Sequence, residues 1–142
     1  MDVVLITDKN YFDYAMVTVK SLLAHTTSPI EVNVILTFEK ESLQVELEQA
    51  IKKKYPHAQF KFLTFNLEKL AHIKPKNHVS LAAYIKMYLP ELFKDKNQMI
   101  FLDSDLLITE DIKNLWAYFK EDFTLAAVEN PEYTQDFQLL LR

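Results

Sequence analysis

The sequence contains no cysteine and no glycine, and each absence excludes a class of site. Without cysteine there are no disulfides and no thiolate nucleophile or metal ligand. Without glycine, neither the P-loop nor the G-x-G-x-x-G dinucleotide fingerprint can be built, so a phosphate group must be held in another way. The absence of both residue types also leads to the hypothesis that the sequence is engineered.

Long hydrophobic runs and a positive net charge are missing as well. No apolar stretch approaches the roughly 18 residues of a membrane span, and the first residues lack the features of a signal peptide. The net charge of −4 disfavours a general nucleic-acid-binding protein, which is usually basic. With 142 residues, 49% of them hydrophobic, we expect one soluble, cytoplasmic domain with a substantial core.

Short apolar runs alternate along the chain with segments of helical periodicity. The apolar runs predict strands over residues 3–6, 31–36, 60–65, 99–102 and 124–128. The intervening segments predict helices, including one over 80–89, with Pro90 near its end, and one capped by Thr109 with Leu115 and Trp116 facing inward. After the last of these elements we expect a turn at Asn130–Pro131 and a short terminal helix. This alternation predicts an α/β fold, with a mostly parallel sheet and helices on both faces.

An acidic pair, Asp103 and Asp105, directly follows the fourth apolar run. Strand side chains alternate, so the two carboxylates are expected on one side, roughly 7 Å apart along the chain. Because two unpaired carboxylates are costly in a core, we expect the strand to end there and the pair to face a cleft. Two hard oxygen donors can hold Mn²⁺ or Mg²⁺. The alternative is a polar strand end that caps the next helix.

A third acid falls on the same predicted edge of the sheet. In open parallel sheets, ligands bind beyond the carboxyl ends of the strands, near the point where the strand order reverses. Asp8 follows the first predicted strand, as Asp103 and Asp105 follow the fourth. The three carboxylates are therefore expected to face one ligand site.

Five motifs run along the chain in order: Thr7-Asp-Lys-Asn-Tyr11, Lys20-Ser-Leu-Leu23, His78-Val-Ser-Leu-Ala-Ala-Tyr-Ile-Lys86 with Leu89-Pro-Glu-Leu92, Phe101-Leu-Asp-Ser-Asp-Leu-Leu107, and Ile112-Lys-Asn-Leu-Trp116. Together they resemble glycosyltransferase family 8. This family comprises retaining galactosyl- and glucosyltransferases of the Rossmann-like GT-A fold, and within it the sequence resembles the bacterial lipopolysaccharide galactosyltransferases. The resemblance covers almost the whole chain.

The resemblance implies a UDP-sugar site. Asp103 and Asp105 would ligate the Mn²⁺, or Mg²⁺, that offsets the diphosphate charge and stabilises UDP as a leaving group. The other implied donor contacts are Asp8, Asn10 and Tyr11 for the uridine, Ser104 for the ribose, and Ser80 and Tyr84 on the segment lining the sugar-phosphate pocket. Without the resemblance, Asp8 and Asn10 are ordinary turn residues, and the two tyrosines are ordinary packing residues.

Two positions depart from the family pattern. Lys86 stands where the family usually has Arg; it keeps the positive charge near the donor but lacks the planar fork that binds phosphate through two hydrogen bonds. Asn130 stands where related enzymes place an acidic or amide residue beside the reacting sugar. It can hydrogen-bond but cannot act as a carboxylate nucleophile. Lys86 and Asn130 are the candidate catalytic residues.

The members of this family continue well past residue 142, and the further part supplies a histidine ligand and most of the acceptor pocket. No histidine follows Asp105 in this chain. Two hypotheses therefore stand. The first is a glycosyltransferase, or its donor-binding domain, that moves a hexose from UDP to a glycan or lipopolysaccharide acceptor. The second is a truncated or engineered scaffold or binding module without turnover. Self-association and contact with a membrane surface stay open, while nucleic acid is not an expected partner.

Overall fold

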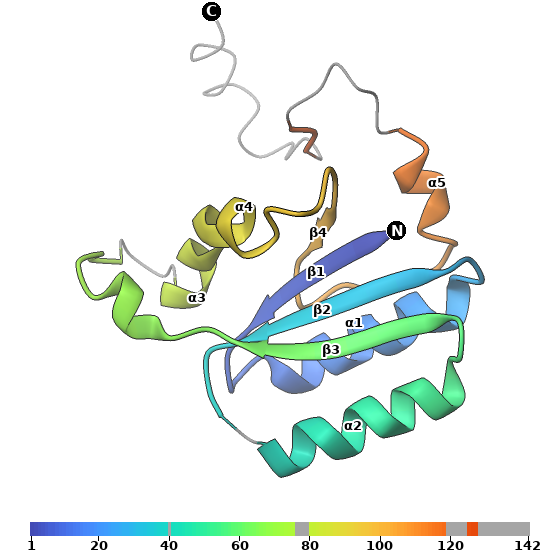
Figure 1. Ribbon diagram of the computed structural model, residues 1–142, viewed down its shortest axis with the longest axis horizontal. Coiled ribbons are helices and arrows are strands. Elements are labelled where there is room, and N and C mark those ends of the chain that lie inside the picture. The colour runs from blue at the N-terminus through green and yellow to red at the C-terminus, as the bar shows by residue number, and fades with distance from the viewer. Residues whose placement is uncertain (40, 76–79, 119–124, 128–142) are drawn as a thin grey trace, which may run out of the picture.

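A computed structural model describes residues 1–39, 41–75, 80–118 and 125–127. Within these residues, four parallel strands form one sheet in the order β3-β2-β1-β4. The strands are β1 (Asp2–Thr7), β2 (Ile30–Leu36), β3 (Ala58–Thr64) and β4 (Ile100–Leu102). The predicted α/β class with a parallel sheet is confirmed (Figure 1).

Helices cover both faces of the sheet, as predicted (Figure 1). On one face lie α1 (Phe12–His25) and α2 (Glu41–Lys54), and on the other lie the single turns η1 (Leu67–Leu70), α3 (Leu81–Tyr84), η2 (Ile85–Tyr88) and α4 (Leu89–Leu92). The side chains of β1 alternate between these layers: Val3 and Leu5 pack with α1, whereas Val4 and Ile6 pack on the opposite face. Because β1 is buried on both faces, its sequence is a continuous apolar run.

The order of the strands places the reversal point between β1 and β4. The chain moves outward from β1 through β2 to β3, and then returns to the other side of β1 with β4. Leu5 pairs with Leu102, so the two strands end next to each other. The residues that follow them, Asp8 and Asp103, thus leave the sheet at the edge where open α/β sheets bind ligands.

The predicted helix over 80–89 is not one continuous helix. It divides into α3, η2 and α4, and Pro90 lies in the first turn of α4 rather than near a helix end. Proline lacks an N–H group, and the first helical turn is the place where that group has no helical acceptor. Proline therefore starts a new turn here.

Three predictions for the C-terminal part are wrong. The helix α5 (Lys113–Trp116) begins later than a cap at Thr109 requires, and Asp111 Oδ1 accepts a hydrogen bond from the Lys113 N–H at 3.0 Å instead. Trp116 packs against the core, but Leu115 is exposed. Residues 125–127, the described part of the predicted last strand, are exposed and belong to no strand. The predicted Asn130–Pro131 turn and terminal helix lie outside the described residues.

Candidate functional site

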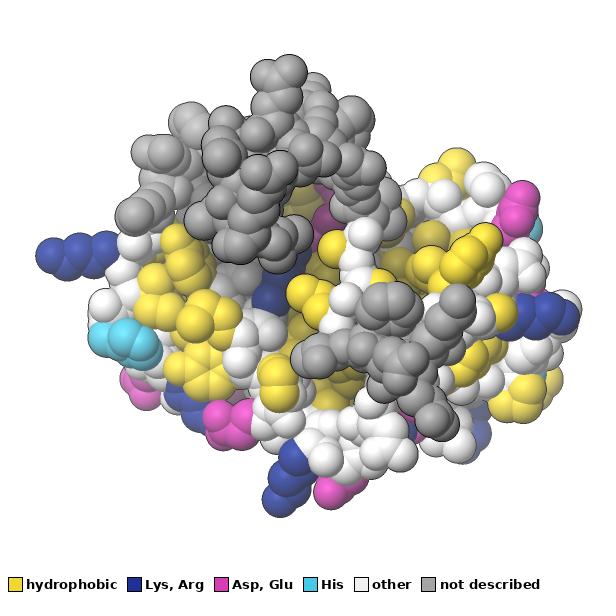
Figure 2. Space-filling model, turned by 90° about the horizontal axis from the view of Figure 1, so that it is seen from above, with side chains coloured by type: hydrophobic (Ala, Val, Ile, Leu, Met, Phe, Trp, Pro, Cys, Tyr) yellow, Lys and Arg dark blue, Asp and Glu magenta, His cyan; other side chains and the backbone are white. Residues whose placement is uncertain are grey.

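A hollow of about 270 Å³ lies at the carboxyl edge of the sheet. We call it the edge hollow. Three separate segments line it. They are the end of β1 with the turn after it (Ile6, Thr7, Asp8 and Tyr11), the turns α3 and η2 with the residue before them (Ser80, Ala82, Ala83 and Lys86), and β4 with the turn after it (Phe101, Asp103, Ser104 and Asp105). Seen from above, basic and acidic side chains are visible between areas of apolar side chains (Figure 2).

Most of the residues singled out from the sequence meet in this hollow. Those lining it are Asp8, Tyr11, Ser80, Lys86, Asp103, Ser104 and Asp105. Two others are nearby in the chain but are not among its lining: Asn10, and Tyr84, which packs against the apolar cluster on that face of the sheet. Asn130 and the motif residue His78 lie outside the described residues.

The acidic pair follows the end of its strand, as predicted. The strand β4 ends at Leu102, Asp103 and Asp105 are exposed, and Ser104 between them is buried. The two carboxylates face the same hollow although Ser104 and Asp105 already lie in a turn. The alternative role, capping the next helix, is not seen, because Asp111 bonds to the first turn of α5.

The acidic pair shares the hollow with the side chain of Lys86. Lys86 Nζ lies 3.2 Å from Asp103 Oδ1 and 4.3 Å from the centre of the Phe101 ring. Both charged side chains are about half exposed, at 48% for Lys86 and 65% for Asp103, so their attraction is screened by water. Among the described residues of the lining, there is one ammonium group against the three carboxylates of Asp8, Asp103 and Asp105, so this part of the lining carries surplus negative charge.

This donor set fits a divalent cation that is shared with a phosphate ligand. Among the described residues, no three His, Asp or Glu side chains come together to hold a metal ion by themselves. Asp103 and Asp105 supply hard carboxylate oxygens in an open hollow. Mg²⁺ is usually bound in this way, by one or two carboxylates with phosphate oxygens and water completing the shell.

Asp8 organises the turn between β1 and α1. Its Oδ1 accepts hydrogen bonds from the N–H groups of Asn10, at 2.8 Å, and Tyr11, at 3.0 Å. One of the two carboxylate oxygens of Asp8 is therefore used to form the turn. The Tyr11 side chain is half exposed, and its ring centre lies 5.7 Å from that of Tyr14. A face of an exposed aromatic ring at a hollow is suited to stacking against a flat ligand.

Hydroxyl groups hold the turn that carries the acidic pair; the sequence predicted neither the roles of Thr18 and Ser21 nor the structural role of Ser104. Ser104 Oγ donates to the Ile6 carbonyl at 2.5 Å, which ties the turn to the end of β1. Thr18 and Ser21, both on α1, bond to the backbone of residues 104–108. The available signal was a threonine within the apolar stripe of a helix, beside Ala15, Val19 and Leu22.

Comparisons with known proteins show the family of the chain. Residues 2–139 match the model of the family described as glycosyl transferase family 8. The chain belongs to this family. A probable galacturonosyltransferase-like protein 4 of Arabidopsis thaliana is 33% identical over 135 residues, which are 89% of this chain and 36% of that protein. General stress protein A of Bacillus subtilis (strain 168) is 37% identical over 71 residues, 49% of this chain and 25% of that protein.

Solved structures of glycosyltransferases share the fold. The galactosyltransferase LgtC, solved in complex with donor and acceptor sugar analogs, superposes with a TM-score of 0.69 at 27% identity, over 84% of this chain and 43% of LgtC. The glycosyltransferase GlyE of Streptococcus pneumoniae TIGR4 superposes with a TM-score of 0.70 over 92% of this chain and 30% of GlyE, and at 18% identity it supports the fold alone. The chain spans less than half the length of each of these relatives.

None of the helices in the described part of the chain has the length and apolar character that crossing a bilayer requires.

Proposed function

We propose that this chain is the donor-binding portion of a retaining glycosyltransferase, which binds a UDP-sugar with Mn²⁺ or Mg²⁺ and passes the hexose to a glycan acceptor. One observation carries the proposal: the acids Asp8, Asp103 and Asp105, the cation Lys86 and the ring of Tyr11 line one hollow at the reversal point of the sheet. Membership of glycosyl transferase family 8 supports the reaction class.

The lining residues suit the parts of such a donor. Asp103 and Asp105 would hold the cation, which offsets the charge of the diphosphate and so favours the departure of UDP. Lys86 carries a mobile ammonium group that can move from Asp103 to a phosphate oxygen when the donor enters. Tyr11 offers its exposed ring to the uracil, and Asp8 has a second carboxylate oxygen for a polar group of the nucleoside.

The remaining donor contacts are proposed on the same basis. Ser80 lies at the start of α3 and is exposed to the edge hollow. The Ser104 hydroxyl donates a hydrogen bond to the Ile6 carbonyl oxygen, so the oxygen of Ser104 can accept a hydrogen bond from a ribose hydroxyl. Asn10 and Asn130 complete the proposed set, beside the nucleoside and the reacting sugar respectively. A lipopolysaccharide is one acceptor class, which follows from the family resemblance.

Calorimetric titration with UDP tests the donor site. We expect the wild-type chain to bind UDP in the presence of Mn²⁺, and to bind it at least tenfold more weakly when EDTA replaces the metal. The double variant Asp103→Asn with Asp105→Asn keeps the shape of the turn but removes both negative charges. It should lose the metal-dependent part of the affinity. Glu46→Gln with Glu48→Gln, which has the same spacing on α2 and lies outside the edge hollow, is the matched control.

The titration, combined with an assay for hexose released from a UDP-sugar, distinguishes the two hypotheses about turnover. Absence of metal-dependent UDP binding by the wild type would refute the donor site. Metal-dependent binding together with release of free hexose from UDP-galactose or UDP-glucose would support a transferase. Binding without any release or transfer would instead support the scaffold hypothesis, in which the chain keeps the donor site without turnover.

A further inference from the structure

Thr18 lies in the middle of α1 and is fully buried, yet it makes its hydrogen bonds outside its own helix. A buried threonine in a helix commonly bonds to the carbonyl of the preceding turn. Here Thr18 Oγ1 lies 2.9 Å from the Ser104 carbonyl oxygen and 2.8 Å from the Leu106 carbonyl oxygen. The single hydroxyl hydrogen is therefore shared between these two acceptors. The Leu106 N–H donates back to Thr18 Oγ1 at 3.0 Å.

These bonds are made to the backbone on both sides of Asp105. The carbonyl of Ser104 belongs to the peptide group on the amino side of Asp105, and the N–H of Leu106 belongs to the peptide group on its carboxyl side. One hydroxyl therefore fixes both peptide groups next to this acid. Because the sheet ladder of β4 ends at Leu102, no strand pairing orients the backbone at this point.

Ser104 and Ser21 anchor the turn on either side of Thr18. The Ser104 hydroxyl bonds to β1 through Ile6, so the residue is held by its side chain and its carbonyl at once. Ser21, one helical turn after Thr18, accepts from the Ile108 N–H at 3.0 Å and donates to the Thr18 carbonyl at 2.9 Å. The segment 104–108 thus runs along α1 on a row of hydroxyl groups.

We propose that Thr18 is a positioning residue of the donor site, whose hydroxyl sets the direction in which Asp105 meets the cation and the diphosphate. The inference rests on the proposed function. Groups that orient a metal ligand from behind typically change metal affinity by 10–100-fold when removed. The carboxylate of Asp105 is itself exposed, so the fixed backbone is what limits its orientation. A loosened turn would spread this carboxylate over several directions and weaken a shared metal.

The test compares four chains by calorimetric titration of UDP, in Mn²⁺ and in EDTA. Thr18→Val keeps the side-chain shape but removes the hydroxyl, and Thr18→Ser keeps the hydroxyl. Thr26→Val is the matched control: Thr26 is buried at the C-terminal end of the same helix, and its hydroxyl has no hydrogen-bond partner within the described part of the chain. The electron paramagnetic resonance spectrum of bound Mn²⁺ is recorded for each chain.

We expect Thr18→Val to lower the UDP affinity in Mn²⁺ about tenfold or more, to leave the affinity in EDTA within about twofold, and to change the spectrum of bound Mn²⁺. Thr18→Ser should restore most of the affinity, and Thr26→Val should bind as the wild type does. Thermal unfolding shows whether each variant is folded at the titration temperature.

Three results would overturn the inference. Thr18→Val could bind UDP in Mn²⁺ as tightly as the wild type. It could lose affinity equally in Mn²⁺ and in EDTA, which would make the hydroxyl a general stabiliser of the fold. Finally, the wild-type chain itself could show no metal-dependent binding, and then the proposed function fails and the inference fails with it. If instead the wild type binds UDP with Mn²⁺ and the Thr18→Val variant is unaffected, only the inference is refuted.

Discussion

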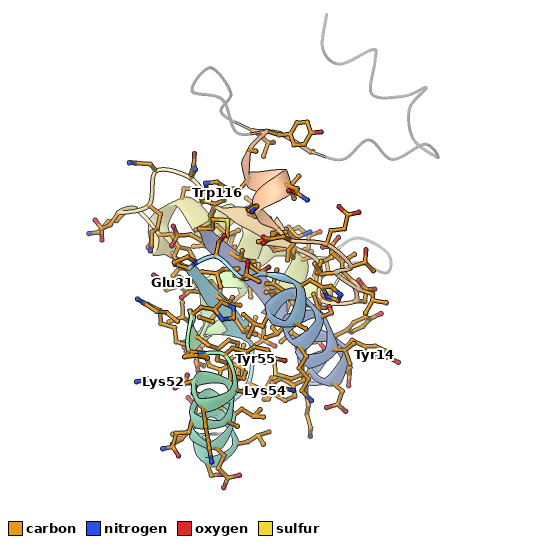
Figure 3. All side chains as sticks on the ribbon, turned by 90° about the vertical axis from the view of Figure 1, so that its right-hand side faces the viewer. Tyr14, Glu31, Lys52, Lys54, Tyr55 and Trp116 are labelled. Carbon is orange, nitrogen blue, oxygen red and sulfur yellow. The ribbon has the colours of Figure 1, made fainter. Side chains whose placement is uncertain are left out.

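The two ends of the sheet handle charge in opposite ways. At the amino ends of the strands, Lys96 Nζ lies 2.5 Å from Asp2 Oδ1 and 2.8 Å from Glu31 Oε2, and Lys61 Nζ lies 3.0 Å from Glu31 Oε1. Figure 3 looks onto this end, with Glu31 labelled. At the carboxyl ends, three acids share the edge hollow with Lys86, which contacts Asp103 alone among them.

The amino-end cluster is balanced, with two acids against two lysines, and all of its members except Lys61, which is 50% exposed, are shielded. The side chains of Asp2, Glu31 and Lys96 are 23%, 18% and 30% exposed, respectively. The carboxyl-end acids outnumber their lysine, and the contact between Lys86 and Asp103 is about half exposed. We conclude that the first cluster stabilises the fold, whereas the second leaves charge available for a ligand. Substitutions should therefore separate stability from binding.

The largest expected effect on stability is at Lys96. Lys96→Met leaves two partly buried carboxylates, Asp2 and Glu31, without their shared cation. Loss of a partner of a shielded charge leaves the remaining charge desolvated, so we expect a loss of about 2 kcal/mol in the free energy of unfolding. Urea unfolding monitored by circular dichroism measures it.

Lys94, an exposed lysine in the same turn, provides the control. Lys94→Met should change the free energy of unfolding by less than about 0.5 kcal/mol. Below the unfolding transition, Lys96→Met should bind UDP in Mn²⁺ as the wild type does. A loss of UDP affinity in the folded Lys96→Met chain would contradict the separation of the two ends.

The next effect concerns acid stability. The hydrogen bond from Lys96 is the main reason why the pKa of Glu31 is lowered from 4.5 to about 2, with Lys61 and Asn33 contributing. Because the folded pKa lies below the unfolded one, this group stabilises the fold fully above pH 4.5, and its contribution is lost as the pH falls toward 2. Glu31→Gln should therefore have a shallower decrease of unfolding temperature between pH 4.5 and 2. Equal slopes for the two chains would contradict this assignment.

These two ends also differ in how far the sequence predicted them. The strand β1 was predictable because a strand covered on both faces has a continuous apolar run, and β2 because Val32 and Val34 alternate with polar residues before the run ends in Ile35 and Leu36. The site followed from position: Asp8 and Asp103 each come directly after such a run, and parallel strands end at a common edge. Family resemblance then added residues such as Ser80 and Lys86, whose segment has no distinctive pattern of its own.

The contacts that hold the site together were not predictable. Thr18 and Ser104 are separated by 86 residues, and local spacing carries no information about which carbonyl a buried hydroxyl will meet. The cluster of Asp2, Glu31 and Lys96 has the same origin, because its members come together only through the register of parallel strands. The sequence did not predict that residues 81–92 divide into three turns, because a proline such as Pro90 can either follow the end of a helix or lie in the first turn of the next one.

A smaller effect on stability and a clear effect on binding are expected at Lys86. Lys86→Gln removes a half-exposed ion pair, which is worth at most about 1 kcal/mol. In Mn²⁺, its UDP affinity should fall about tenfold, because a charge-assisted bond to phosphate is replaced by a neutral one. Calorimetry measures the affinity, and urea unfolding measures the stability. A loss of stability like that of Lys96→Met would place Lys86 in the fold-stabilising class instead.

The smallest and most specific change is Lys86→Arg. The guanidinium group keeps the charge, so its attraction to the phosphates should stay similar, but its planar fork can donate two parallel bonds where the ammonium group donates one. We expect the UDP affinity in Mn²⁺ to rise about threefold, with unchanged unfolding and no gain in EDTA if the fork acts on the metal-bound diphosphate. A gain of the same size in EDTA would show that the fork binds UDP independently of the acidic pair. A decrease would mean that the fork is too large for the space between Asp103 and Phe101 that the lysine occupies.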